Sequence, residues 1–527
     1  MIEPVEAEFA NPPIFSNQQE RILEDEVIEQ PGAITHASDD ETRAGTPENE
    51  KLKGKIIVDF EPGSREDPRE WNKGRKWFVT LSCAALCLTV ALGSAMPTGD
   101  LSGTAKGLHV SDEVIYLSIT LFVLGFGVGP LLFAPLSEMI GRKTVYSISI
   151  FFYFIFTLPS CLATNIATML AGRMIAGIAS SAPMTNVGGS IADVWAVEDR
   201  GIPMSIFSMT LFMGPCLGPL FGGWIALKTG QWRWIYWVLF ILVGVVAAFT
   251  FIVPETYAPI ILRRKAARLN KENNTDVYIS KHDLGNTTTL KESIKVSLMR
   301  PFVLMFCEPI ILFMSFYLSF IYSLLYALFF AFPIAFEEIR GWNMGMTGVS
   351  FVSIIIGIGL AMCIMPVQEK LYARHCANGA VPEARLYLMM LGCIIMPLSL
   401  MVFAWTTFEN GPDIIWVGPA AAGVMFGFSM LVIYISANSY IVDSYSDYAA
   451  SAVAAKTFMR SCIGATVPLW ITQLFHNLGF NWAGLFLSLV GFCIAPIPFI
   501  FFFKGGAVRE RSTRATKNGA ESRDVAH

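Results

Sequence analysis

The chain has 527 residues and a formal net charge of −4, a sum that by itself points to no charged partner. Hydrophobic residues make up 54% of it, charged residues only 15%, and Phe alone occurs 40 times, a composition that excludes a string of ordinary soluble domains. The apolar residues fall in blocks of around 20, the length of a membrane-crossing helix, so we predict an all-α polytopic membrane protein.

Residues 1–70 are rich in Glu, Asp, Pro and Asn, so we expect a disordered cytoplasmic N-terminal tail. The first 50 residues carry no signal-peptide core, so the first membrane helix would also be the targeting signal. Residues 67–77 (DPREWNKGRKW) then combine aromatic and basic side chains, which suits either an interfacial anchor on the cytoplasmic side or a plain linker.

Twelve apolar runs follow, and each is long enough to cross a bilayer as a helix. They are 77–97, 113–134, 145–163, 167–193, 203–227, 233–253, 302–333, 344–366, 385–406, 413–440, 449–474 and 480–503. We therefore predict an N-terminal six-helix half (71–253), a central loop (254–300), a C-terminal six-helix half (301–504) and a C-terminal tail (505–527).

Basic residues are concentrated in alternate loops, which predicts the orientation of the chain. The basic set is Arg142, Lys143, Arg200, Lys370, Arg374, Arg385 and nine residues of the central loop, whereas the other loops hold only Lys106, Lys228, Arg233 and Arg340. We therefore expect both termini and the central loop to be cytoplasmic. The sequons at 273–275 and 286–288 lie in that loop and should not be glycosylated.

The two halves show a weak parallel repeat. An offset of 250 residues relates Gly177 to Gly427, Asp193 to Asp443 and Gly214 to Gly464, and an offset of 231 relates Glu138 to Glu369 and Lys143 to Arg374. Chance could produce a few such matches, but the matching loop positions favour duplication. Two related six-helix halves are a transporter architecture, with the substrate site between the halves near the membrane midplane.

The loop between the second and third runs, which we call the latch loop (134–143), gathers charges around Gly141. A charge at the bilayer centre costs roughly 2.5–3.5 kcal/mol, so this loop should lie at the membrane surface. Glu138 and Arg142 could pair with neighbouring helices in one conformational state and release them in another. Alternatively, Arg142 and Lys143 only fix topology.

Two ionisable residues interrupt the apolar runs and are our candidates for proton coupling. Arg173 must either face a polar interior or extend toward an interface. Glu308 is either a buried proton carrier or a helix-start residue near the cytoplasmic surface, since it follows Arg300 by only two turns.

The eleventh run carries Lys456 and Arg460 on one helical face, which is costly unless that face meets water or an anion. They either line a substrate cavity or extend to the cytoplasmic end. Tyr317, among several aromatic residues of the seventh run, is a further cavity candidate, although such residues more often pack or face lipid.

The fifth run reads MGPCLGPLFGGW (213–224), in which glycines repeat every four residues and so share one face. Glycines on one face permit close helix packing, and the prolines predict a bend. Whether the bend also moves stays open. The residues concerned are Gly214, Pro215, Gly218, Pro219, Gly222 and Gly223.

Sequence marks of other protein classes are missing. The ten cysteines lie mostly in apolar runs, and no CxxC or Cys/His spacing suggests a metal. No P-loop lies in the central loop, which argues against ATP-driven transport, and no nucleic-acid module or enzyme signature stands out. We expect a non-enzymatic monomer that has no metal or cofactor and whose partners are the bilayer, a small molecule and protons.

Together these features resemble the major facilitator superfamily, and more narrowly its fungal twelve-span drug:proton antiporter group, over about 65–505. Glu138 and Gly141-Arg142-Lys143 resemble the superfamily's signature in the loop between spans 2 and 3, although Ala134 stands where that signature begins with Gly. Arg173 with Gly177 resembles the span 4 signature, whose arginine is associated with proton coupling, and the span 5 motif resembles the antiporter signature. Three longer stretches look typical of the fungal group: PETYAPIILRRKA (254–266), RPFVLMFCEPI (300–310) and NSYIVDSYSDYAASA (438–452).

The resemblance implies alternating access and export of a drug, toxin or secondary metabolite in exchange for protons, in a fungal plasma membrane. It also favours the latch over a topology marker for Glu138 and Arg142. Lys456 departs from the neutral polar residue that relatives more often carry, which suggests an anionic substrate. The alternatives are a nutrient or organic-acid importer or uniporter of the same fold, and a membrane sensor that does not transport.

Overall fold

The computed structural model describes residues 55–61, 63–196, 199–281, 290–375, 381–407, 416–512 and 514–515. The first 54 residues of the expected disordered tail, the sequon at 286–288 and all but the beginning of the C-terminal tail lie outside these described residues. The described chain forms two units. The smaller one comprises the described part of Met1–Glu70 with Ile261–Asn286, and the larger one contains the rest.

The smaller unit contains a two-stranded parallel sheet of β1 (Ile56–Val58) and β2 (Tyr278–Ser280), together with most of α12 (Ala258–Asn273). Val58 buries its side chain against Leu262 and Ala266 of α12. Lys265 holds Glu66 at 3.0 Å. This region therefore differs from the disordered tail and plain loop that its polar composition predicts, because one apolar triplet, Ile56 to Val58, finds a helix to pack against.

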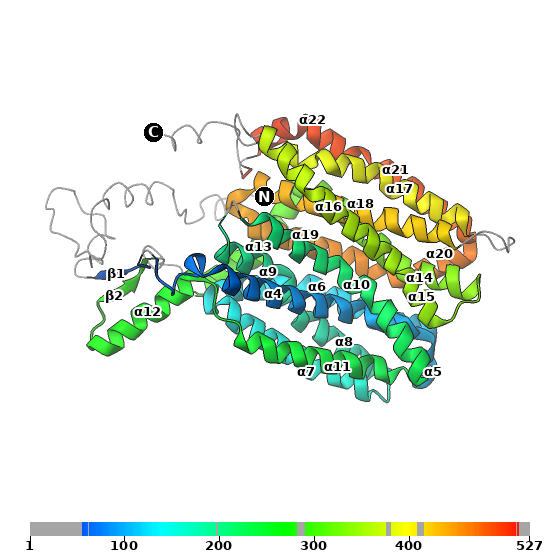
Figure 1. Ribbon diagram of the computed structural model, residues 1–527, viewed down its shortest axis with the longest axis horizontal. Helices are drawn as coiled ribbons and strands as arrows, with labels where there is room; N and C mark the ends of the chain where they lie inside the picture. Colours follow the sequence, from blue (N-terminus) through cyan, green and yellow to red (C-terminus); the bar gives the residue numbers. More distant parts are fainter. Residues whose placement is uncertain are drawn as a thin grey trace, which may run out of the picture. The chain divides into compact units, whose positions relative to one another are not determined.

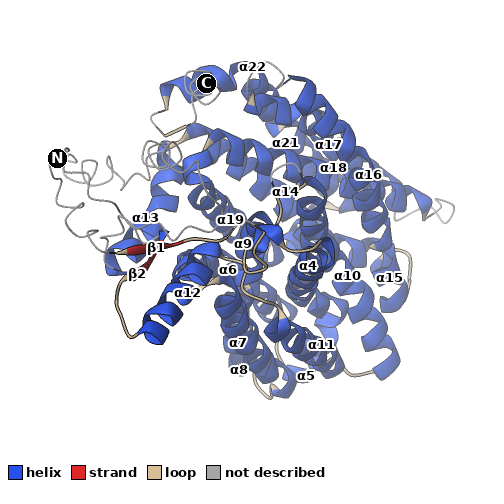
Figure 2. Cartoon of the chain, turned by 60° about the vertical axis from the view of Figure 1, so that its left-hand side comes forward, coloured by secondary structure: helices blue, strands red, loops and turns tan. Residues whose placement is uncertain are grey.

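The larger unit is a helical bundle, in which the long helices run side by side (Figure 1). Its first half contains α4 (Lys73–Ala95), α5 (Leu101–Leu108), α6 (Asp112–Ile140), α7 (Arg142–Leu162), α8 (Ile166–Ser180), α9 (Ala182–Val194), α10 (Gly201–Thr229) and α11 (Arg233–Ile252). Its second half contains α13 (Leu290–Cys307), α14 (Pro309–Pro333), α15 (Met344–Ser350), α16 (Val352–His375), α17 (Tyr387–Thr406), α18 (Val417–Ser444), α19 (Ala449–Thr466), α20 (Ile471–Leu478), α21 (Phe480–Ile494) and α22 (Pro496–Arg511). Helices make up almost all of the described chain, as the blue elements of Figure 2 show.

Ten stretches of the described chain are long and apolar enough to cross a membrane, and they match ten of the twelve predicted spans. The fourth span falls short because it divides at Ser181 into α8 and α9, where Pro183 cannot continue the backbone hydrogen-bond ladder. The eleventh falls short because Lys456 and Arg460 lower the mean hydropathy of α19. Both nevertheless lie inside the bundle, α8 against α6 and α19 against α6 and α14.

The glycines of α10 allow it to lie directly on α4. A Cβ atom on Gly218 would come within 2.7 Å of the backbone between Ala95 and Met96, and one on Gly222 within 2.2 Å of the Met96 carbonyl oxygen. Pro215 and Pro219 sit inside α10 without ending it. The motif thus places α10 and α4 at a separation that no larger residue permits.

One hydrophobic cluster runs through both halves and fixes their mutual position. Phe212 of α10 and Ile119 of α6 belong to the same buried cluster as most of α14 and α18. Tyr116 of α6 packs edge-on against Phe330 of α14, with ring centroids 5.0 Å apart. Any site formed by α4, α6, α14, α18 and α19 is therefore shared between the halves.

Candidate functional site

The latch loop turns at Gly141, which ends α6 and precedes α7 with φ 99°. L-residues rarely adopt this conformation, so glycine is required by the backbone. A Cβ atom here would also lie 2.3 Å from an oxygen of Glu255. That carboxylate accepts hydrogen bonds from the backbone N–H groups of Arg142 (2.9 Å) and Lys143 (3.5 Å), and so caps the start of α7.

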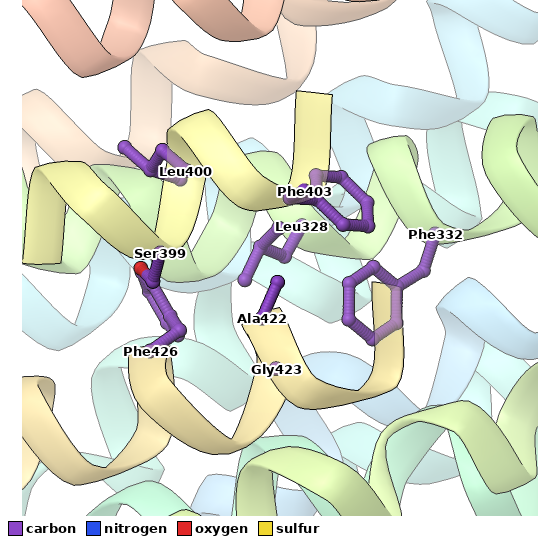
Figure 3. A pocket seen from close by; sticks show the side chains of 8 residues that line it. All are labelled: Leu328, Phe332, Ser399, Leu400, Phe403, Ala422, Gly423 and Phe426. Carbon is purple, nitrogen blue, oxygen red and sulfur yellow. The ribbon is translucent and has the colours of Figure 1, made fainter. Parts of the chain in front are cut away.

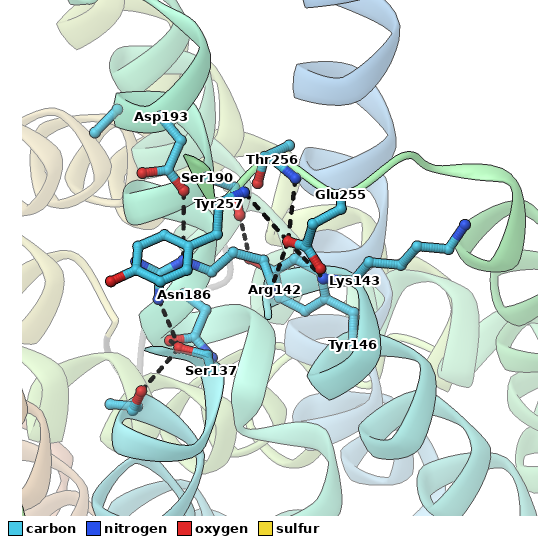
Figure 4. A network of polar contacts seen from close by, with 12 residues as sticks. Ser137, Arg142, Lys143, Tyr146, Asn186, Ser190, Asp193, Glu255, Thr256 and Tyr257 are labelled. Carbon is cyan, nitrogen blue, oxygen red and sulfur yellow. Dashed lines mark hydrogen bonds and ion pairs between the residues drawn. The ribbon is translucent and has the colours of Figure 1, made fainter. Parts of the chain in front are cut away.

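The Arg142 side chain joins three elements at this end of the bundle (Figure 4). Its Nε donates to Asp193 Oδ2 at 3.5 Å, at the end of α9. Its Nη1 donates to Ser137 Oγ at 2.5 Å, and its guanidinium lies 4.9 Å from the centre of the Tyr257 ring. Arg142 is thus the centre of a polar network.

The other two latch candidates contribute less to this network. Glu138 is exposed and has no ion pair within 4.0 Å among the described residues. The Lys143 side chain points away from the network in Figure 4. The carboxylates that hold Arg142 are instead Asp193, which the repeat had marked only as a matched position, and Glu255 of the PETYAP stretch, which sequence reasoning left without a role.

The second half repeats this arrangement with a different arginine. Arg385 of η6 (Pro382–Leu386) pairs with Asp443 at 2.8 Å and with Glu369 at 3.1 Å, and it stacks on the Tyr372 ring at 3.5 Å. Glu369, which the repeat matches to Glu138, therefore belongs to the polar network of the second half. Arg374, which the repeat matches to Lys143, is exposed.

Arg173 of α8 is 2% exposed and is held by backbone carbonyl oxygens. It donates to Gly93 and Ser94 of α4 at 3.0 and 3.4 Å, and to Ser118 of α6 at 3.4 Å. Its guanidinium also lies 4.0 Å from the centre of the Phe122 ring. The side chain faces the protein interior, which was the first of the two alternatives for this residue.

Glu308 occupies the break between α13 and α14, where Pro309 opens the second helix. Its Oε2 accepts hydrogen bonds from Tyr445 at 2.9 Å and from Ser512 at 2.8 Å. These partners stand at the ends of α18 and α22. The carboxylate is 4% exposed, yet it lies at a helix start, as the second alternative for this residue stated.

A buried ion pair near Glu308 was not predicted. Arg509 of α22 donates to Glu383 of η6 through Nε at 2.9 Å and Nη2 at 2.8 Å. Gly505, one turn before Arg509, leaves room for this carboxylate, since a Cβ atom there would lie 2.9 Å from Glu383 Oε1. Glu383 and Arg509 each lie at the edge of an apolar run, and no local sequence pattern indicates that the two side chains pair.

Lys456 and Arg460 lie in the interior of the bundle, 1% and 5% exposed. Lys456 Nζ donates to Asn438 Oδ1 and lies 4.8 Å from the centre of the Tyr434 ring. The Arg460 guanidinium lies 4.3 Å from the centre of the Tyr322 ring, and its Nε is buried with no hydrogen-bond partner in the described chain. Neither cation extends to an interface.

We call these cations and their aromatic neighbours the cation–tyrosine site: Lys456, Arg460, Asn438, Tyr322, Tyr326 and Tyr434. Both halves build it. Tyr326 donates to Ser94 of α4 at 3.3 Å, and Phe212 of α10 packs edge-on against Tyr434, with ring centroids 4.7 Å apart. The third cavity candidate, Tyr317, is buried in the apolar core and makes no described contact with either cation.

A small apolar pocket lies apart from this site, within the second half (Figure 3). Its lining comes from α14, α17 and α18 and consists of Leu328, Phe332, Ser399, Leu400, Phe403, Ala422, Gly423 and Phe426. The hydroxyl of Ser399 already donates to the Met396 carbonyl oxygen at 2.6 Å. The lining is apolar apart from this hydroxyl, so the pocket offers little to orient a polar substrate.

The family model of the Major Facilitator Superfamily matches residues 81–468. The chain belongs to the major facilitator superfamily. The match covers both halves, and the ten apolar spans with α8–α9 and α19 give the twelve membrane helices of this fold. As a major facilitator protein, the chain is a multi-pass membrane transporter.

Curated relatives of this major facilitator protein are fungal transporters. The transporter paaT of Penicillium rubens is 41% identical over 492 residues, covering 91% of this chain and 89% of paaT. The multidrug transporter mdrA of Aspergillus fumigatus is 37% identical over 466 residues, covering 87% of this chain and 76% of mdrA. Polyamine transporter 3 of Saccharomyces cerevisiae is 37% identical over 459 residues, covering 87% of this chain and 73% of the polyamine transporter.

Proposed function

We propose that this protein is a proton-coupled exporter of small organic molecules, acting by alternating access in a plasma membrane. Both termini would lie in the cytoplasm, an orientation that the concentration of basic residues in alternate loops favours. The proton gradient would supply the energy, without a cofactor, and one chain would suffice, because a single chain supplies both halves of the site.

The observation that carries this proposal is the cation–tyrosine site, because side chains from the two halves meet there. Rocking one half against the other would break the Tyr326–Ser94 and Phe212–Tyr434 contacts and open the site to one side. The networks of Arg142 and Arg385 lie each within one half, so they hold helix ends together while the halves move.

Export is favoured over import by two features. The α10 motif, whose glycines pack closely on α4, resembles the antiporter signature, and the relative mdrA is named a multidrug transporter. Polyamine transport is a second candidate, because Polyamine transporter 3 is also a relative. Against it, no described carboxylate lies within 4.0 Å of Lys456 or Arg460 to receive a polycation.

Proteoliposomes with an acidic interior test the mechanism. We expect labelled probes to accumulate above the level in protein-free vesicles, and an ionophore that dissipates the pH gradient to abolish this excess. The probes are benzoate, benzamide and spermidine, so that anionic, neutral and cationic compounds are compared. Flux that does not respond to the gradient would instead show a uniporter, and binding without flux a sensor.

A further inference from the structure

The cation–tyrosine site holds two basic side chains, and no acidic side chain of the described residues pairs with either. Lys456 and Arg460 are four residues apart on α19 and so share a face, an arrangement in which like charges repel. Both side chains are almost fully buried, and no described carboxylate lies within 4.0 Å of either. Buried charges in proteins are normally paired, so this site lacks its counter-charge.

The hydrogen-bonding capacity of the two cations is also incompletely used. The Lys456 ammonium has three N–H donors, and among the described residues it meets one acceptor, Asn438 Oδ1. The Arg460 Nε–H is buried and has no acceptor in the described chain. An oxyanion entering between these groups would supply both the missing charge and the missing acceptors.

The surroundings of the cations are aromatic. Tyr322 and Tyr326 pack edge-on with ring centroids 5.0 Å apart, and Arg460 lies over the Tyr322 face at 4.3 Å. Phe212 packs against Tyr434, whose ring centre lies 4.8 Å from Lys456 Nζ and 5.7 Å from the Arg460 guanidinium. The ring faces suit an apolar or aromatic body, and the hydroxyls of Tyr322 and Tyr326 already contact each other at 3.4 Å, so such a body fits these walls better than a sugar does.

From this geometry we propose that the cation–tyrosine site binds the carboxylate of a small organic acid that carries an apolar body. The carboxylate lies between Lys456 Nζ and Arg460 Nε, and the apolar body lies against the tyrosine rings. This inference rests on the proposed function as a transporter and names the substrate class of its central site.

Equilibrium binding to the purified full-length protein, measured without any ion gradient, tests the proposal. The probes are benzoate, 1-naphthoate and hexanoate, each compared with its uncharged amide. A hydrogen bond to a charged group is stronger than one between neutral groups, so at least one acid should bind about tenfold or more tightly than its amide. Lys456→Met and Arg460→Met should each remove this preference.

Lys228→Met is the matched control, since Lys228 is an exposed cation of α10 outside the site, and it should keep the preference for acids. Thermal denaturation identifies variants that do not fold, and Arg460→Gln replaces Arg460→Met if the latter fails. The proposal is overturned if every acid binds no better than its amide, if both site variants keep the preference, or if chloride or spermidine binds instead. Intact acid binding without gradient-driven flux would overturn the proposed proton-coupled export, and the assignment of the bound ligand class would stand.

Discussion

Arg509 and Glu383 form a two-bond ion pair inside the second half, linking the end of its last span to the start of its third. Arg509 is 1% exposed and Glu383 is 7% exposed. In the first half Glu255, just after α11, caps the start of α7 through the N–H of Arg142. Each half thus ties the end of its last span to the start of its third, by different chemistry.

Arg509→Ala should destabilise the protein by about 3–5 kcal/mol, because it leaves Glu383 buried without its partner. Chemical denaturation of the detergent-solubilised protein measures this loss. Arg511→Ala is the matched control, because it removes an exposed cation two residues away and should change stability little. Equal effects of the two substitutions would show that the ion pair does not hold α22.

Arg142→Ala should lower the transport rate at least about tenfold while the amount of protein in the membrane stays similar, because the substitution releases α9 from the start of α7. Lys143→Ala should have a smaller effect, since Glu255 contacts only the backbone of Lys143. Uptake assays normalised to the protein in the membrane compare the two. A parallel loss of membrane protein in Arg142→Ala would make the latch loop a topology marker.

Gly141→Ala should destabilise the turn by about 1–3 kcal/mol, because alanine is strained at this positive φ. The added Cβ also meets Glu255, so the cap on α7 would be displaced. Gly359→Ala in α16 is the control, because a Cβ there meets nothing within 4 Å and the helix should gain slightly. Thermal denaturation of both variants measures the two changes in stability. Unchanged stability of Gly141→Ala would contradict the positive φ at this turn.

The smaller unit should loosen in acid. A hydrogen bond from Lys265, with further help from Arg268, lowers the pKa of the Glu66 carboxyl below its ordinary value of 4.5. Because the folded-state pKa is the lower one, this stabilisation is complete above pH 4.5 and disappears as the pH falls through the lowered pKa. Glu66 is 42% exposed, so the effect should stay at about 1 kcal/mol or less.

Hydrogen exchange of the α12 amides measures this effect as protection factors at neutral and acidic pH. The Glu66→Gln variant should show the lower protection at neutral pH and little further change in acid. If wild type and variant lose protection equally on acidification, another group controls the unit.

The membrane helices could be predicted from the sequence because each apolar run is by itself long enough to cross the bilayer. The division of the fourth span into two helices could not be predicted. Pro183 lies at the break, but the run stays apolar across Ser181. The packing of β1 against α12 was also hidden. Those segments lie more than 200 residues apart in the sequence, and local composition does not reveal their pairing.

The sequence predicted individual residues of the candidate sites, but not which residues contact one another. Arg142 was found from its loop, yet its carboxylates lie 51 and 113 residues away, beyond any local spacing. The offset of 231 relates Arg374 to Lys143 and gave no counterpart for Arg142. The cation that pairs in the second half is Arg385, which the sequence marked only as one of the basic loop residues. For Glu308, the following proline was the local sign of a helix start.

The carbonyl oxygens around Arg173 have a consequence for how the first half moves. Arg173 belongs to α8 and donates hydrogen bonds to backbone carbonyls of α4 and α6, so one buried side chain connects three helices. Shifting one of these helices against the others would leave a buried arginine donor without its acceptor, which is costly. We therefore expect α4, α6 and α8 to move as one rigid body when the two halves rock.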